Sequence, residues 1–205
     1  MSLQLIKKHI TPLSILDIGA NHGQFYCEAR KIFPDSYFYL IEGNPYCEPA
    51  LKGFEIDYTI ALLSDKEKEV DFFIRNGETS CTGNSIYKED SDFYKEGSYF
   101  KKQLFTKTLD SVLQEKRFDL IKLDVQGSEL DIIRGGLDIV KAAKALLLEV
   151  AVTDFNIGAP KKEEVFQYLA SIGFEPVEKI ADLNHPILHT LVQQDFLFLN
   201  KSYDK

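Results

Sequence analysis

The chain has 205 residues, 44% of them hydrophobic, so it is long enough and apolar enough to bury one sizeable core. Its 32 acidic residues outnumber 24 lysines and arginines, and the net charge of −8 has the wrong sign for a protein that must neutralise phosphates. Three cysteines without a Cys-x-x-Cys pair argue against a disulfide framework and a cysteine-based zinc site, and no apolar run is long enough to span a membrane. We therefore expect a cytoplasmic protein with no nucleic-acid partner and no membrane association.

Short apolar runs alternate with segments of helical spacing, a pattern typical of a parallel sheet with helices on both faces. The predicted strands are Leu13–Ile18, Tyr37–Glu42, Tyr58–Leu62, Phe118–Asp124, Ala145–Ala151, Phe174–Ile180 and Asp195–Asn200. The predicted helices fall near His22–Phe33, Pro45–Lys52, Leu109–Gln114, Ser128–Ile133 and Lys161–Ile172. No linker or repeat divides the chain, so we expect one α/β domain over residues 1–205.

One segment interrupts the alternation of strands and helices. Val70–Arg75 alternates like a further strand, and Asn76–Gln103 then continues without a clear period. A connection this long inside a compact domain is usually functional, so we expect an inserted loop or lid at about residues 76–103. Its aromatic residues suit a ring-shaped, hydroxylated substrate, or they form a small core that holds the loop down. They are Tyr87, Phe93, Tyr94, Tyr99 and Phe100.

The first predicted strand ends in Asp17–Gly23, which leads directly into a helix. In a doubly wound fold the backbone comes close to a ligand at this point. Gly19 permits a tight turn, and Gly23 lets the helix begin close to the bound molecule. A dinucleotide-binding loop would have a further glycine where this chain has Asn21, and Asp17 would place a negative charge near the phosphates. The loop therefore favours a ligand other than NAD. Binding of NAD remains the alternative.

S-adenosylmethionine has a sulfonium and an amino acid but no phosphate, so Asp17 can lie near its ammonium group, directly or through water. The second predicted strand ends in Glu42, 19 residues after Gly23, where a carboxylate can accept hydrogen bonds from both ribose hydroxyls. The combination predicts S-adenosylmethionine as the cofactor. In the alternative interpretation the glycines only form turns, and Asp17 and Glu42 are ordinary charges next to helices.

With these motifs the sequence resembles the FkbM-type S-adenosylmethionine-dependent methyltransferases. The resemblance spans roughly Ile15 to Val150 and rests on four motifs in the family's order. They are Asp17–Gly23, Glu42–Pro45, Thr108–Asp110 and Lys122–Glu129. The family usually has proline where this chain has Gly43, a departure that affects the loop on the adenosine side without removing the Glu42 carboxylate.

The resemblance implies a seven-stranded, mostly parallel, Rossmann-like methyltransferase sheet. It also implies O-methylation of a hydroxyl on a small sugar-like or natural-product acceptor, and it leaves the oligomeric state open. The expected cofactor-binding residues are Asp17, Gly19, Asn21, Gly23, Glu42 and Asn44. A base-methylating N-methyltransferase would show Asn/Asp-Pro-Pro-Tyr/Phe where this chain has Asp124–Gly127. A catalytically inert binding module that retains the cofactor site is the alternative from another class.

Methyl transfer to a hydroxyl needs a general base, because an alcohol is a poor nucleophile while it keeps its proton. Lys122 and Asp124 project to the same side of the fourth regular strand, and we expect Asp124 beside the transferred methyl group. A structural salt bridge between them, with Glu149 as a further member, explains the same pattern. The candidate bases are Asp124, Lys122, Glu149 and a histidine.

Two histidines, His185 and His189, follow the sixth predicted strand in a connection that returns across the catalytic edge. Each is a candidate base, with a solvated loop residue as the alternative, and His185 is the one we assign to the site. Asp124 and Glu149 lack a clear third oxygen ligand, so we expect no metal site.

Overall fold

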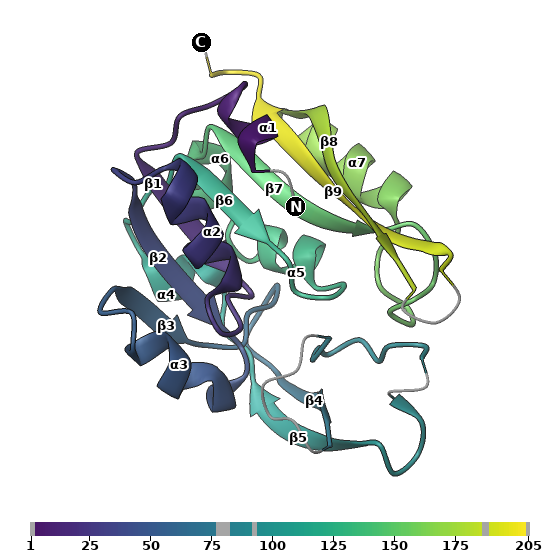
Figure 1. The fold of residues 1–205 in the computed structure, drawn as a ribbon. Helices are drawn as coiled ribbons and strands as arrows, with labels where there is room; N and C mark the ends of the chain where they lie inside the picture. The colour runs from purple at the N-terminus through teal and green to yellow at the C-terminus, as the bar shows by residue number, and fades with distance from the viewer. Residues whose placement is uncertain (1–2, 77–82, 92–93, 186–188, 204–205) are drawn as a thin grey trace.

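The computed structural model describes residues 3–76, 83–91, 94–185 and 189–203. Its main sheet has seven strands in the order β3-β2-β1-β6-β7-β9-β8 (Figure 1). The strands are β1 (Ser14–Ile18), β2 (Tyr37–Glu42), β3 (Asp57–Ile60), β6 (Leu120–Leu123), β7 (Ala145–Ala151), β8 (Phe174–Asn184) and β9 (Leu191–Asn200). Only β9 runs antiparallel to its neighbours, β7 and β8. The expected seven-stranded, mostly parallel sheet is confirmed.

Helices cover both faces of this sheet because successive side chains of its strands point to opposite sides. Ile15 packs in one core with residues of the first three α-helices, whereas Leu16 packs in another core with residues of the last four. The helices are α1 (Gln4–Lys7), α2 (Gln24–Ile32), the 3-10 turn η1 (Pro45–Cys47), α3 (Glu48–Lys52), α4 (Leu109–Leu113), α5 (Glu129–Arg134), α6 (Leu137–Ala142) and α7 (Lys162–Ser171). None of them, within the part of the chain described, is long and apolar enough to cross a membrane.

The sequence predicts a loop over residues 76–103, but the last five residues of that range belong to a strand. Tyr99–Phe105 forms strand β5, which pairs antiparallel with β4 (Glu69–Arg75) in a separate two-stranded sheet. The segment lacks an apolar alternation because most of its side chains are exposed or only partly buried. Figure 1 shows β4 and β5 beyond the end of the main sheet toward which β2 and β6 point. Residues 77–82 and 92–93 of the expected lid, including Phe93, lie outside the described residues.

The order of the strands fixes where a ligand can bind. From β1 the chain moves outward to β2 and β3, and it later returns to place β6 on the other side of β1. The carboxyl ends of β1 and β6 therefore flank a topological switch point, where open α/β sheets bind their ligands. The loops after β1, β2 and β6 are the three segments that meet there.

Candidate functional site

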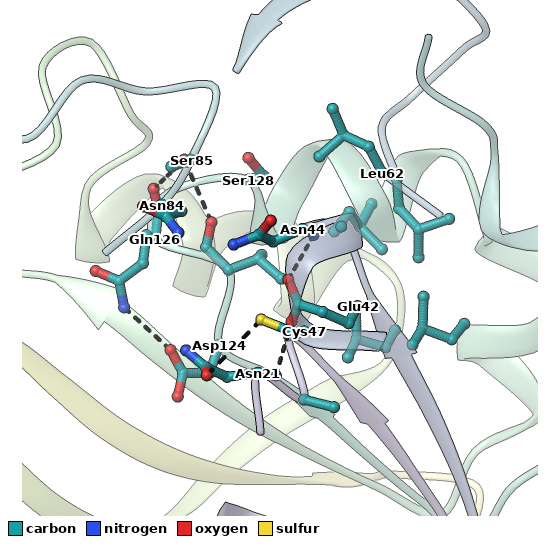
Figure 2. A pocket seen from close by; sticks show the side chains of 18 of the residues that line it. Asn21, Glu42, Asn44, Cys47, Leu62, Asn84, Ser85, Asp124, Gln126 and Ser128 are labelled. Atoms are coloured by element: carbon teal, nitrogen blue, oxygen red, sulfur yellow. Dashed lines mark hydrogen bonds between the residues drawn. The ribbon is translucent and has the colours of Figure 1, made fainter. Parts of the chain in front are cut away.

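A cavity of about 380 Å³ lies at the carboxyl ends of β1, β2 and β6. Its walls come from the loops after these strands, from residues 61–63 after β3, and from residues 83–86 between β4 and β5. Apolar side chains at the β3 end include Ala61 and Leu62. The charged side chains of the lining are Glu28, Glu42, Lys122 and Asp124. Figure 2 draws Glu42, Cys47 and Leu62 on one side of this cavity and Asn84, Ser85 and Gln126 on the other.

The loop after β1 is shaped by two glycines with positive φ. Gly19 has φ of 79°, and a Cβ on it would lie 2.0 Å from the carbonyl oxygen of Asp124. A Cβ on Gly23, also at φ of 79°, would lie 2.3 Å from the ring of Phe54. Only glycine permits these two approaches, which bring the loop against β6 and the start of α2 against Phe54. Asn21, between them, is itself left-handed at φ of 50°.

Glu42 at the end of β2 is held by two backbone donors. Asn21 N donates to its Oε2 and Asn44 N to its Oε1, each at 2.7 Å. Burial raises the pKa of Glu42, and the two N–H groups oppose that rise because they favour the carboxylate. Each oxygen accepts one of these bonds and has a second lone pair, so the carboxylate can also receive two hydroxyl donors from the cavity. The side chain of Asn44 accepts from Tyr46 N and caps η1.

Asp17 and Lys122 form a buried ion pair beneath the loop after β1. Lys122 Nζ lies 3.0 Å from Asp17 Oδ1 and 3.4 Å from Asp124 Oδ2, and it donates to the Gly19 carbonyl at 3.2 Å. Burial acts to lower the pKa of Lys122, but the two carboxylates outweigh it and raise that pKa, so the ammonium stays charged. Asp17 is fully buried and does not line the cavity. Its charge is paired with Lys122, so a contribution of Asp17 to the ligand's ammonium group, as the sequence suggested, would have to pass through water or through this ion pair.

The loop after β6 turns sharply at Gln126, with φ of 57°, and Gly127, with φ of 103°. Buried Glu129 supports this turn because its Oε1 accepts from Val125 N at 3.0 Å and Gly127 N at 3.3 Å. Burial raises the pKa of Glu129 to about 7, against the effect of those backbone donors. The turn directs the side chain of Gln126 along the cavity wall beside Asp124.

Gln126 connects Asp124 to Glu149, the second carboxylate expected at the catalytic edge. Its Nε2 donates to Asp124 Oδ1 at 3.0 Å and to Glu149 Oε2 at 2.6 Å. Gln193 Nε2 donates to the same Glu149 oxygen at 2.8 Å. Burial, reinforced by Asp124, raises the pKa of Glu149 well above its usual range, and Glu149 does not line the cavity. The amide of Gln126 therefore lies between the partly exposed carboxylate of Asp124 and the buried carboxyl of Glu149.

His185 lies apart from these groups. It is 8% exposed, and its ring packs edge-on against Phe155 at 5.6 Å between centroids. It is absent from the cavity lining, and the connection after it continues into residues 186–188, outside the described residues. His189 is exposed. No group of three or more His, Cys, Asp or Glu side chains in the described ranges has a geometry that could hold a metal ion.

No role could be assigned from the sequence to three residues that contribute to the site. Gln126 lies inside the quoted Lys122–Glu129 motif, but only its left-handed backbone directs its side chain toward Glu149. Gln193 and Asn84 come from β9 and from the segment before β5, whose nearness to β6 follows from the three-dimensional fold.

Comparison with known proteins identifies both a family and a fold. The model of the methyltransferase FkbM domain matches residues 17–176. No curated protein sequence matches the chain. Solved structures with only 8–13% sequence identity share its fold.

Magnesium protoporphyrin IX methyltransferase from Synechocystis PCC 6803, solved with bound SAM, has a TM-score of 0.54 at 9% identity, over 96% of this chain and 74% of that chain. An O-methyltransferase family protein from Burkholderia thailandensis has a TM-score of 0.54 at 8% identity, over 94% and 52%. A ribosomal protein L11 methylase from Lactobacillus delbrueckii subsp. bulgaricus has a TM-score of 0.50 at 13% identity, over 97% and 76%. These likenesses show the methyltransferase Rossmann fold.

Proposed function

The chain belongs to the FkbM family of S-adenosylmethionine-dependent methyltransferases, and from this premise we propose that it methylates a hydroxyl of a small, uncharged, sugar-like acceptor. The observation that carries the proposal is the place of Asp124. Its carboxylate lines the cavity at the end of β6, while Glu42 lines the same cavity at the end of β2. One cavity can therefore hold a methyl donor at Glu42 and a hydroxyl nucleophile at Asp124.

The residues around Glu42 fit the cofactor that the family uses. When bound, S-adenosylmethionine supplies a methyl group on a positively charged sulfonium. Glu42 would accept its ribose hydroxyls with the lone pairs that Asn21 and Asn44 leave free, and Ala61 and Leu62 offer apolar surface to adenine. Gly19 would let the backbone approach the donor closely.

Asp124 is the candidate general base that the geometry favours over the other three. Lys122 stays protonated between two carboxylates, so it cannot accept a proton. Glu149 lies behind Gln126, and its raised pKa favours the neutral carboxyl. Because His185 is not part of the lining, Asp124 is left to accept the hydroxyl proton while the oxygen attacks the methyl carbon.

The charge of the cavity favours a neutral acceptor. Among the described residues, three carboxylates and one ammonium line it, and that ammonium, Lys122, is already neutralised by Asp17 and Asp124. A phosphate or carboxylate on the acceptor would meet repulsion from Glu42 and Asp124, and the described lining offers it no lysine or arginine other than Lys122.

The test of the proposed function is donor turnover with a matched set of acceptors. We expect S-adenosylhomocysteine to form with methyl glycosides of glucose, galactose, mannose or rhamnose, and kcat/KM to be at least about tenfold lower with the corresponding sugar phosphates. The mass of the product should exceed that of the glycoside by one methylene unit, because a methyl group replaces a hydrogen. The product should also have one exchangeable hydroxyl hydrogen fewer than the glycoside. Binding of S-adenosylhomocysteine without turnover on any glycoside would contradict the proposal and favour an inert binding module.

The assignment of Glu42 makes a separate prediction about donor affinity. Glu42→Ala should weaken binding of S-adenosylhomocysteine by about 1.5–3 kcal/mol, since hydrogen bonds to a charged acceptor are lost. Calorimetric titration measures the difference directly. Glu28→Ala is the matched control, because Glu28 also lines the cavity but is exposed and pairs with Lys31. Equal affinity of wild type and Glu42→Ala would show that the ribose hydroxyls bind elsewhere.

A further inference from the structure

The segment 83–86, between β4 and β5, brings an unpaired donor to the cavity wall. Asn84 lines the cavity, and its amide nitrogen Nδ2 is buried with no hydrogen-bond partner among the described residues. The orientation of the amide is set by its oxygen, since Oδ1 accepts from Arg75 N at 3.3 Å. A buried N–H without an acceptor is unfavourable, so this donor is suited to a ligand oxygen.

Asn84 is anchored over the loop after β6, the loop that begins with Asp124. Ser85 Oγ donates to the Gln126 carbonyl at 2.8 Å, and Phe73 N donates to the Ser85 carbonyl at 2.8 Å. Tyr94 Oη donates to the Gly83 carbonyl at 2.7 Å. Bonds on both sides of Asn84 therefore hold its amide in place, and Figure 2 shows it close to Ser85 and Gln126, across the cavity from Glu42.

We propose that Asn84 is a specificity-determining residue that recognises the acceptor, with Nδ2 donating to an oxygen next to the hydroxyl that is methylated. This inference rests on the proposed O-methylation. The methyl donor is assigned to the Glu42 side of the cavity. The amide of Asn84 lies on the Gln126 side, which is the part of the cavity left for the methyl acceptor.

An amide N–H can donate to a hydroxyl, ether or carbonyl oxygen but not to an ammonium group. The proposal therefore selects a vicinal diol or an equivalent oxygen pair, and it disfavours an acceptor with a protonated amine next to the reacting hydroxyl. Together with the negative charge of the cavity, this defines the acceptor as a neutral polyol.

Asn84→Asp is the sharpest variant, because it keeps the size and the Oδ1 acceptor and replaces only the Nδ2 donor by an oxygen. Asn76→Asp is the matched control. It makes the same chemical change in the same insertion, at an exposed amide that donates to the Gly97 carbonyl outside the cavity. Asn84→Ala removes the donor without adding a charge and separates the two effects.

The measurement uses the four methyl glycosides named above, both as substrates and as ligands of the protein saturated with S-adenosylhomocysteine. We expect Asn84→Asp and Asn84→Ala to raise KM and Kd for the preferred glycoside about tenfold, with unchanged affinity for S-adenosylhomocysteine, and Asn76→Asp to match wild type. Unchanged glycoside affinity in both Asn84 variants would overturn the role of Asn84 while leaving O-methylation standing. If the variants weakened only the binding of S-adenosylhomocysteine, Asn84 would belong to the methyl-donor site, and its proposed role toward the acceptor would also be overturned. If wild type neither binds nor methylates any glycoside, the acceptor class itself is wrong and both proposals fail.

Discussion

Replacing Asp124 by asparagine is expected to lower kcat by about 10²–10⁴-fold, the usual contribution of a general base. The amide keeps the size of the carboxylate and can still accept from Gln126, but it cannot take the hydroxyl proton. Affinity for S-adenosylhomocysteine should stay within about threefold of wild type, since the base acts on the acceptor during the chemical step. Single-turnover rates and calorimetric titration of the same preparation measure the two quantities separately.

Glu149→Gln is the matched control for that experiment. Burial and Asp124 raise the pKa of Glu149, which favours its neutral carboxyl, and a glutamine oxygen can still accept from Gln126 and Gln193. We expect kcat of this variant to fall less than about tenfold. The opposite pattern, an active Asp124→Asn and an inactive Glu149→Gln, would show that the proton passes to the buried carboxyl.

The sequence could predict that Gly19, Asn21 and Glu42 meet at one cavity, because the determinants of that arrangement are local. Gly19 and Gly23 mark a strand that turns into a helix, and Glu42 ends the next strand in the same βαβ unit. Each position follows from the chain within a few residues, and the family motifs support the same interpretation. The sheet could be predicted for the same reason, because buried strands of a parallel sheet are continuous apolar runs.

The polar network at β6 could not be predicted, because its partners are distant in sequence. The sequence pairs Lys122 with Asp124 on one strand, but the register between β1 and β6 places Asp17 directly opposite Lys122. No local sequence pattern predicts that β6 lies next to β1. The same holds for Gln193 on β9 and for Asn84 in the insertion, which reach the site only through the order of the strands and the fold of β4 and β5.

Breaking the buried ion pair between Asp17 and Lys122 is expected to have a large effect on the stability of the protein. Lys122→Met is expected to lower the free energy of unfolding by about 3–5 kcal/mol, the usual result of removing one partner of a buried ion pair. The side chains of Lys122 and Asp17 are 5% and 0% exposed, so water cannot replace the lost ammonium. Asp124 matters less here because its side chain is 36% exposed and keeps contact with solvent. Denaturant unfolding monitored by circular dichroism measures the change.

Asp17→Asn combined with Lys122→Met isolates the cause of that loss. If the unpaired Asp17 charge is what destabilises the single variant, removing the charge should recover most of the lost stability, and the two substitutions should be strongly non-additive. Both variants should bind S-adenosylhomocysteine less tightly than wild type if the loop after β1 holds the methyl donor as proposed, because Lys122 also holds the Gly19 carbonyl of that loop. A double variant as unstable as the sum of the two single variants would show that Lys122 acts by packing, including its contact with the ring of Phe25, and that its pairing with Asp17 contributes little.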